Sequence, residues 1–279
     1  MLSVLLTAIL AGALAGSLCG STGILCDRLG LRTVAFAVAH GALAGAAFSF
    51  VIGGSSILMG MAFALFTSII LGPLADAFEI PIDLVSMTLF SLYNALTFIF
   101  IILSPGIVLA AEKVTQLLWG SVLAVTLDYL IILSAIAVLY ALFLVVMWHR
   151  IAPILFDRRL AEAEGIRVRV YAYALIIVTG LVVVFTLRIT GGFLVFSLIY
   201  IPASSALQLS ENMKVIVALS ALLGTISAVS GVFLSFLIDL PVGSSIVICA
   251  ALILLTSSTA GYLRRRWLIT SISIEATSD

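Results

Sequence analysis

Packing alone explains His40 less well than it explains any other residue of this sequence. It lies inside a long apolar stretch, about two helical turns beyond Arg32. An ionisable side chain in such a stretch is costly and usually faces a cavity or a partner group. The imidazole could bind a metal cation, accept a proton, or hydrogen-bond to a neighbouring helix. Its position leaves the functional and the structural interpretation open.

Two carboxylates stand at the ends of apolar stretches. Asp83 opens one of them, where a negative charge suits the positive end of the helix dipole, and Asp128 has a similar position. A structural role at the helix terminus explains both. Asp83 is also a candidate for a substrate pathway.

Residues 149–169 form the one long polar interruption of the chain. Within them, Asp157 is a typical helix-starting residue and Gly165 a typical stop. Leu160 and Ala161 supply a small apolar face, and Glu162 lies on the same short run. We expect a short amphipathic helix that could receive a soluble partner, although a solvated loop is the simpler alternative.

The composition assigns the chain to the membrane. Hydrophobic residues make up 63% and charged residues 9% of it, and the mean hydropathy is +1.35. Soluble domains carry about 25% charged residues, so this chain could not cover a water-facing surface. Segments in lipid must satisfy their backbone groups internally, which predicts an all-α polytopic membrane protein.

About 20 apolar residues are needed to cross the hydrocarbon core. The sequence predicts eight or nine such helices, eight if the first or the last does not cross, in a single permease-like transmembrane domain over residues 1–279. Residues 114–128 are too short to span and predict a half-helix or interfacial segment. The fourth span lies within 84–111 and is expected to stop near 104–106, because Pro105 cannot continue a helix. The other expected spans are 2–26, two within 33–75 separated at 53–56, 129–148, 170–187, 191–209, 215–237 and 241–263.

Basic residues predict the orientation. If residues 149–169 are cytoplasmic, alternation places eleven of the 13 Lys and Arg residues inside, and only Lys113 and Arg188 outside. This asymmetry is typical of inner loops. It predicts a multi-pass protein of the cell membrane, surrounded by lipid, with a cytoplasmic C-terminus. The weak point is the loop at residues 76–83, which should be cytoplasmic but holds no basic residue.

Several chemistries find no support. The sequence contains no HExxH, aspartate-rich, GxSxG or P-loop motif, which argues against an enzyme with its own ATP site; energy must come from an ion gradient or another subunit. Nothing indicates a nucleic-acid partner. The three cysteines lack zinc-site spacing and read as small buried hydrophobes. Pro202, inside an apolar run, predicts a helix kink whose freed carbonyls Ser204 and Ser205 could satisfy.

Five segments, in order, give the chain a family resemblance. They are VAHGALAGAAF (38–48), LLWGSVLAVTLDYL (117–130), FDRRLAEAEGI (156–166), GGFLVFSLIYIPASSA (191–206) and LPVGSSIVICAALILL (240–255). With them the chain resembles the permease subunits of zinc, manganese and iron ABC importers, the ABC-3 family. The fourth and fifth segments are the most specific.

The resemblance implies a type II ABC importer permease bundle that acts as a homodimer. It implies two cytoplasmic ATPase subunits, an extracytoplasmic metal-binding protein, and a divalent metal ion as cargo with no stably bound cofactor. The cytoplasmic loop over residues 150–169 would hold the coupling helix, with Asp157, Leu160, Glu162 and Gly165 at the ATPase contact.

One position departs from the family pattern. Family members carry an aspartate four residues before the histidine that matches His40, on the same helix face, and here that residue is Phe36. The cargo would then differ from manganese, or Ser91 or Asn94 would supply the missing ligand. Alternatively, the chain carries a metal chelate such as a siderophore complex. A stand-alone secondary carrier is a further alternative.

Overall fold

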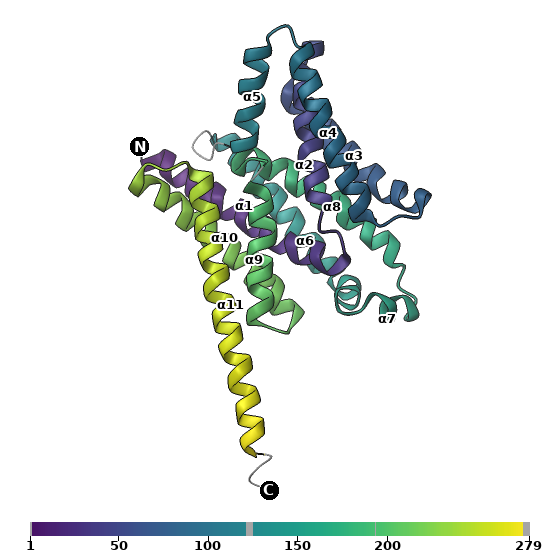
Figure 1. The fold of residues 1–279 in the computed structure, drawn as a ribbon, viewed down its shortest axis with the longest axis vertical. Helices are drawn as coiled ribbons and strands as arrows, with labels where there is room; N and C mark the ends of the chain where they lie inside the picture. Colours follow the sequence, from purple (N-terminus) through teal and green to yellow (C-terminus); the bar gives the residue numbers. More distant parts are fainter. Residues whose placement is uncertain (1, 121–124, 193, 276–279) are drawn as a thin grey trace.

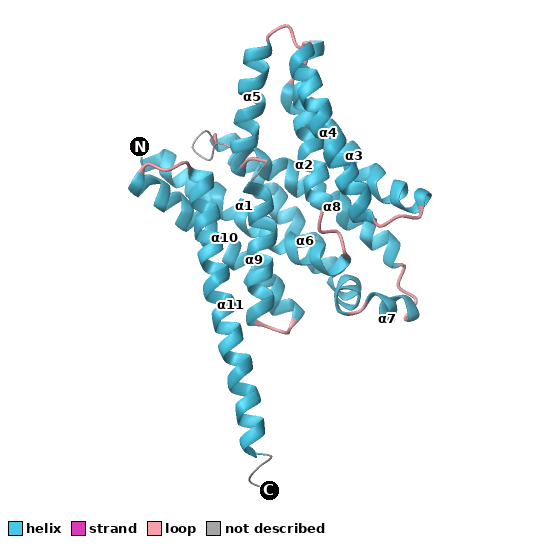
Figure 2. Cartoon of the chain, in the orientation of Figure 1, coloured by secondary structure: helices cyan, strands magenta, loops and turns pink. Residues whose placement is uncertain are grey.

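The computed structural model describes residues 2–120, 125–192 and 194–275, and within these ranges every regular element is a helix (Figure 2). The long helices cross one another in a bundle, and α11 extends away from it toward the C-terminus (Figure 1). The elements are α1 (Leu2–Leu29), α2 (Val34–Ile52), α3 (Ser56–Phe78), α4 (Ile82–Leu103), α5 (Ile107–Trp119), α6 (Leu127–Phe156), α7 (Arg158–Ala163), α8 (Val168–Thr190), α9 (Leu194–Leu209), α10 (Met213–Ile238) and α11 (Val242–Glu275).

Eight of the described helices are long and apolar enough to cross a membrane, which agrees with the predicted count of eight or nine. They are α1, α2, α3, α4, α6, α8, α10 and α11. The ninth expected span corresponds to α9, whose 16 residues extend about 24 Å at 1.5 Å per residue. The short member of the set is therefore an internal helix, and not the first or the last.

The region between α4 and α6 differs from its expected boundaries. The prediction places the fourth helix within 84–111, stopped near 104–106 by Pro105, and a half-helix at 114–128. The stop is confirmed, because α4 ends at Leu103, but the short helix α5 spans Ile107–Trp119. Pro105 cannot continue α4, and Gly120, with φ of 69°, ends α5. The prediction of a short helix was right in kind but wrong in position, and residues 121–124 of the expected segment lie outside the described residues.

Glycines bring α1 and α10 into backbone contact. A Cβ atom on Gly16 would lie 2.3 Å from the carbonyl oxygen of Gly224, and one on Gly20 would lie 2.2 Å from that of Ser220. Side chains at these positions would push the helices apart. Gly12, Gly16 and Gly20 recur every four residues along α1, a spacing of small residues that permits close helix packing, and the last two positions make that contact.

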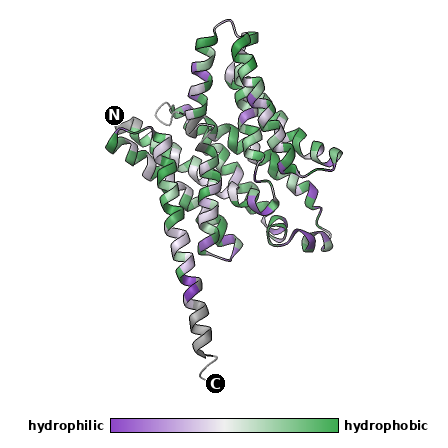
Figure 3. Ribbon diagram, viewed as in Figure 1, coloured by the Kyte–Doolittle hydropathy of each residue, from purple (hydrophilic) through white to green (hydrophobic). Residues whose placement is uncertain are grey.

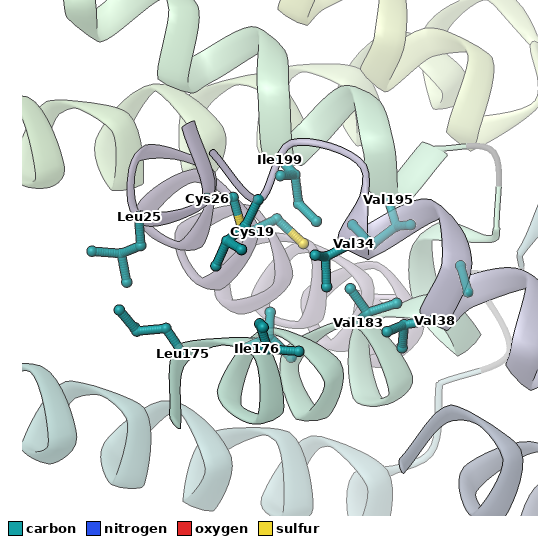
Figure 4. Close-up of a cluster of buried hydrophobic side chains, with 14 of the residues drawn as sticks. Cys19, Leu25, Cys26, Val34, Val38, Leu175, Ile176, Val183, Val195 and Ile199 are labelled. Atoms are coloured by element: carbon teal, nitrogen blue, oxygen red, sulfur yellow. The ribbon is translucent and has the colours of Figure 1, made fainter. Parts of the chain in front are cut away.

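The centre of the bundle lies where α1, α2, α8 and α9 meet (Figure 4). Cys19 and Cys26 point into this apolar cluster and are fully buried. Their sulfur atoms lie 3.5 and 3.4 Å from the hydroxyl oxygens of Thr186 and Thr179 on α8. The prediction that these two cysteines are small buried hydrophobes is confirmed, while Cys249 is half-buried.

Contacts between the end of α3 and the start of α8 place two of the segments predicted to be cytoplasmic side by side. The carboxylate of Asp76 at the end of α3 lies 3.3 Å from the guanidinium of Arg169 on α8 and accepts a hydrogen bond from the Tyr173 hydroxyl. Arg169 therefore supplies, from the first turn of α8, the positive charge that residues 76–83 lack. The polar residues of α7 and the adjacent helix ends gather on the same side (Figure 3).

Candidate functional site

His40 lies in the middle of α2 and is 4% exposed. Its Nδ1 atom is 3.0 Å from the carbonyl oxygen of Phe36, one turn earlier. Because a carbonyl can only accept, Nδ1 carries the proton and Nε2 keeps its lone pair. A histidine that binds a metal is usually oriented in this way, with one ring nitrogen donating to a backbone carbonyl.

Aromatic rings of α4 and α9 contact the imidazole, and two further rings stack beside them. Phe90 of α4 meets it edge-on with ring centroids 4.3 Å apart, and Phe196 of α9 lies parallel to it at 6.0 Å. Phe36 stacks on Phe196 at 3.9 Å and on Tyr200 at 5.9 Å. We call these five residues, Phe36, His40, Phe90, Phe196 and Tyr200, the His40 pocket.

The backbone spacing of the helices builds this pocket. Phe36 and His40 are four residues apart on α2, and Phe196 and Tyr200 are four residues apart on α9, so each pair shares one helix face. The close approach of α2 and α3 holds α2 in place, since a Cβ atom on Gly45 would lie 2.3 Å from the carbonyl oxygen of Met59.

The pocket offers a metal one nitrogen donor and no carboxylate. At position 36, where the family pattern leads us to expect an aspartate, an aromatic ring stacks between Phe196 and Tyr200. No group of three or more His, Cys, Asp or Glu side chains that could hold a metal ion occurs among the described residues. Chemically, His40 can ligate a passing cation, and the pocket of one protomer cannot chelate it.

Asp83 and Asn94 have other partners. Asp83 Oδ1 accepts hydrogen bonds from the backbone N–H of Thr33 at 3.0 Å and from its hydroxyl at 2.6 Å, so this carboxylate ties the start of α4 to the start of α2. Asn94 donates from its amide to the carbonyl of Phe90 at 2.9 Å. Asp83 lies in the first turn of α4, as expected, but its carboxylate bonds to Thr33 and does not cap α4, and these bonds join neither Asp83 nor Asn94 to His40.

The second candidate region is the short helix α7 and its flanks. Asp157 caps it, because Oδ1 accepts from the backbone N–H groups of Arg159 at 2.8 Å and Leu160 at 3.2 Å. Gly165, with φ of 82°, ends it in the left-handed conformation that glycine adopts most readily. The expected short helix is confirmed, with both predicted end signals in use.

The faces of α7 differ in exposure. Ala161 is fully buried against the bundle, whereas Leu160 is 53% and the preceding Phe156 77% exposed. Glu162 forms an ion pair with Arg158, with 3.3 Å between Oε1 and Nε. An anchored helix that presents two large apolar side chains beside charged ones is suited to contact with another protein.

Packed elements join α7 to the His40 pocket. Four residues separate the end of α7 from Val168, where α8 begins, and the Arg169–Asp76 ion pair fixes α8 to α3. The α3 helix in turn packs against α2, where Thr67 donates to the hydroxyl of Tyr93 at 2.8 Å beside Gly41. A displacement of α7 can therefore reach α2 through α8 and α3.

Pro202 lies inside α9, which remains helical from Leu194 to Leu209. Ser205 donates to the carbonyl of Ile201 at 2.9 Å, and so it does not bond to the carbonyl of Leu198, which Pro202 deprives of its usual backbone donor. The kink itself stays a prediction.

Sequence reasoning missed the aromatic partners of His40. The available signal was the repeated four-residue spacing in Phe36–His40 and Phe196–Tyr200. It also missed the tie between Asp76, Arg169 and Tyr173. The sequence signal for this tie was weaker. It was an acidic residue in a loop that the charge asymmetry placed on the same side as the basic loop.

Comparisons with known proteins agree with this architecture. The model of the ABC 3 transport family matches residues 1–261. The manganese transport system membrane protein MntC of Halalkalibacterium halodurans is 30% identical over 259 residues, covering 88% of this chain and 87% of that protein. The high-affinity zinc uptake system membrane protein ZnuB of Buchnera aphidicola is 25% identical and covers 79% of this chain and 84% of that protein.

A solved structure has the same fold. PsaBC from Streptococcus pneumoniae, in complex with Fab, superposes with a TM-score of 0.78 at 26% identity. The match covers 91% of this chain and 90% of the PsaBC chain.

Proposed function

The chain belongs to the ABC 3 transport family, and from that premise we propose that it is the membrane permease of an ABC importer that moves a divalent transition metal inward. Its fold, an all-α multi-pass bundle, is that of a transport subunit. The energy is supplied by a separate ATPase subunit, and the loop holding α7 and the C-terminus are on the cytoplasmic side. The basic-residue asymmetry supports this orientation.

The observation that carries the proposal is the geometry of His40. A buried imidazole deep in a membrane helix has its Nδ1–H committed to the Phe36 carbonyl, which leaves Nε2 as a donor for a cation. In a homodimer, two such imidazoles would border one path. The cation is cargo, so a permanent three-ligand site is not required.

The donor set favours some metals over others. Imidazole suits zinc, iron and copper, whereas manganese prefers oxygen ligands. Phe36 contributes an aromatic ring in place of a carboxylate, and Asp83 is occupied by Thr33. We therefore favour zinc or ferrous iron over manganese as cargo, although relatives of this chain carry the names of manganese and zinc systems.

The remaining partners follow from α7. Its exposed Leu160 and Phe156, with the Asp157 cap and the Gly165 turn holding the helix in shape, are suited to seat in a groove of the ATPase subunit. An extracytoplasmic metal-binding protein would deliver the metal on the opposite side. The chain itself would bind no nucleotide.

Growth rescue tests the function. The complete operon, expressed in cells that lack their own zinc, manganese or iron importers, should restore growth on low zinc or iron and do so poorly on low manganese. Uptake of free iron is compared with that of chelated iron in the same cells. Rescue by the chelate alone would replace the free-ion proposal with chelate transport, and rescue without the ATPase gene would indicate a secondary carrier.

A further inference from the structure

A crevice of about 540 Å³ lies between α1, α6 and α10, and shares no lining residue with the His40 pocket or with α7. Residues within 17–21 of α1, 137–148 of α6 and 214–221 of α10 line it. Its volume is within the range of sites that hold small molecules, about 300–1,000 Å³. It is therefore large enough to hold a ligand.

The lining selects for an apolar occupant. Apart from its Lys214 and Trp148 end, the crevice is lined mainly by alanine, leucine and valine. Ser17 and Ser21 donate their hydroxyl protons to carbonyls of their own helix, Leu14 and Ser17, at 2.9 and 2.7 Å. A polar solute would find few partners there, whereas a hydrocarbon chain would lose nothing by entering.

One end of the crevice has a different character. Lys214, in the first turn of α10, and Trp148, near the end of α6, both line it. Lys214 is exposed and takes part in none of the ion pairs formed among the described residues. Tryptophan is enriched at the headgroup level of membranes, and a lysine at this level attracts anionic lipid phosphates.

The length of the crevice matches one leaflet. From Ala137 to Trp148, α6 rises about 16 Å at 1.5 Å per residue, which is about half of the roughly 30 Å hydrocarbon core. A lipid whose headgroup lies at Lys214 would therefore place its acyl chain along the whole of this lining.

We propose that the crevice binds one acyl chain of an anionic phospholipid, whose phosphate pairs with the ammonium of Lys214 beside the ring of Trp148. The occupant is a lipid of the leaflet bordering Lys214, which the basic residues assign to the cytoplasmic face. The lipid fills the gap between α6 and α10, so it holds these helices together as well as covering apolar surface.

The test uses the purified full-length chain and two lipids with identical oleoyl chains, phosphatidylglycerol and phosphatidylcholine. Native mass spectrometry should show phosphatidylglycerol retained more strongly. Lys214→Gln should lower its retention about fivefold and leave phosphatidylcholine unchanged. The matched control is Lys113→Gln, which removes the only other lysine of the chain, on α5, and should change neither.

A second arm locates the bound chain. A phosphatidylglycerol with a photoreactive acyl chain should label α6 between residues 137 and 148, and Ala141→Trp, which fills the crevice, should abolish the labelling. Melting temperatures measured without added lipid show whether each variant still folds. If Ala141→Trp does not fold, Ala218→Phe replaces it. Equal retention of the two lipids, or unchanged retention in Lys214→Gln, would refute the proposal. So would disulfide cross-linking of two copies through Ala141→Cys in membranes, because the crevice would then be an interface.

Discussion

The His40 pocket and the α7 region are built in opposite ways. Side chains of α2, α4 and α9, which are far apart in the sequence, form the pocket. Four of its five members are aromatic rings, and the fifth is the imidazole of His40. The α7 region is local. Its cap, its ion pair and its end all come from residues 157–165.

The difference shows how each region responds to change. In the pocket, Nε2 is the one nitrogen of His40 that makes no bond to Phe36, so a single substitution should remove the whole of the proposed metal ligand. In α7, several weak local contacts hold one shape, so each substitution weakens the docking surface by a part. The comparison would be wrong if variants of α7 lost all uptake while variants of the pocket lost little.

The largest effect is expected for His40→Ala. Loss of a group that only orients a metal ligand already costs about 10- to 100-fold, so loss of the ligand itself should reduce metal uptake at least as much. Radioactive zinc and iron uptake, measured beside the amount of protein in the membrane, checks this. The control is His149→Ala, the other histidine, which is exposed at the end of α6 and should transport normally.

Next is Gly165→Val. A branched side chain at φ of 82° costs about 1–2 kcal/mol or more, so the turn that ends α7 should distort. We expect uptake and the stimulation of the ATPase subunit to fall severalfold while the protein still reaches the membrane. Gly53→Val carries similar strain, with φ of 72° in equally open space at the far side, and should leave both activities near wild type.

A smaller change is expected for Asp157→Ala. Removing a helix cap costs about 1 kcal/mol, which lowers the population of formed α7 about fivefold if that helix is marginal. Affinity for the ATPase subunit, measured by titrating it onto the purified permease, should weaken by that factor. The control is Ser55→Ala. The Ser55 hydroxyl caps α3 by accepting from the backbone N–H of Leu58, and its loss should leave the affinity for the ATPase subunit unchanged.

The smallest effect is expected for Glu162→Gln. Its pair with Arg158 is exposed, and the order of the charges, Arg before Glu, is the weaker one, so the loss in stability should be under about 0.5 kcal/mol. The melting temperature should hardly move. A severalfold loss of uptake in this variant would mean that Glu162 contacts the ATPase directly.

The sequence predicted the local features well. Hydropathy and length located the spanning helices because lipid permits only internally bonded backbone. The ends of α7 were predictable because Asp157 and Gly165 act through neighbouring backbone groups. The spacing of Gly16 and Gly20 in the sequence is typical of close helix packing, although it does not identify α10 as the partner.

Long-range partners were not predictable. Which rings would surround His40 depends on how α2, α4 and α9 cross, and no local signal encodes that crossing. The same holds for Arg169 and Asp76, whose pairing explains the loop that lacks basic residues. The boundary error at α5 has a physical source too. The break at Pro105 was predicted, but the apolar composition continues beyond it through residues 107–111, which belong to α5.

The buried thiols of Cys19 and Cys26 have a practical consequence. Both have no exposed surface and each contacts a threonine hydroxyl, so a water-soluble maleimide cannot reach them in the folded chain. Replacing Cys249 with serine would then give a background that is silent to labelling without disturbing the core. Cysteines introduced one at a time along residues 150–169 would report directly, in intact cells, on which side of the membrane α7 lies.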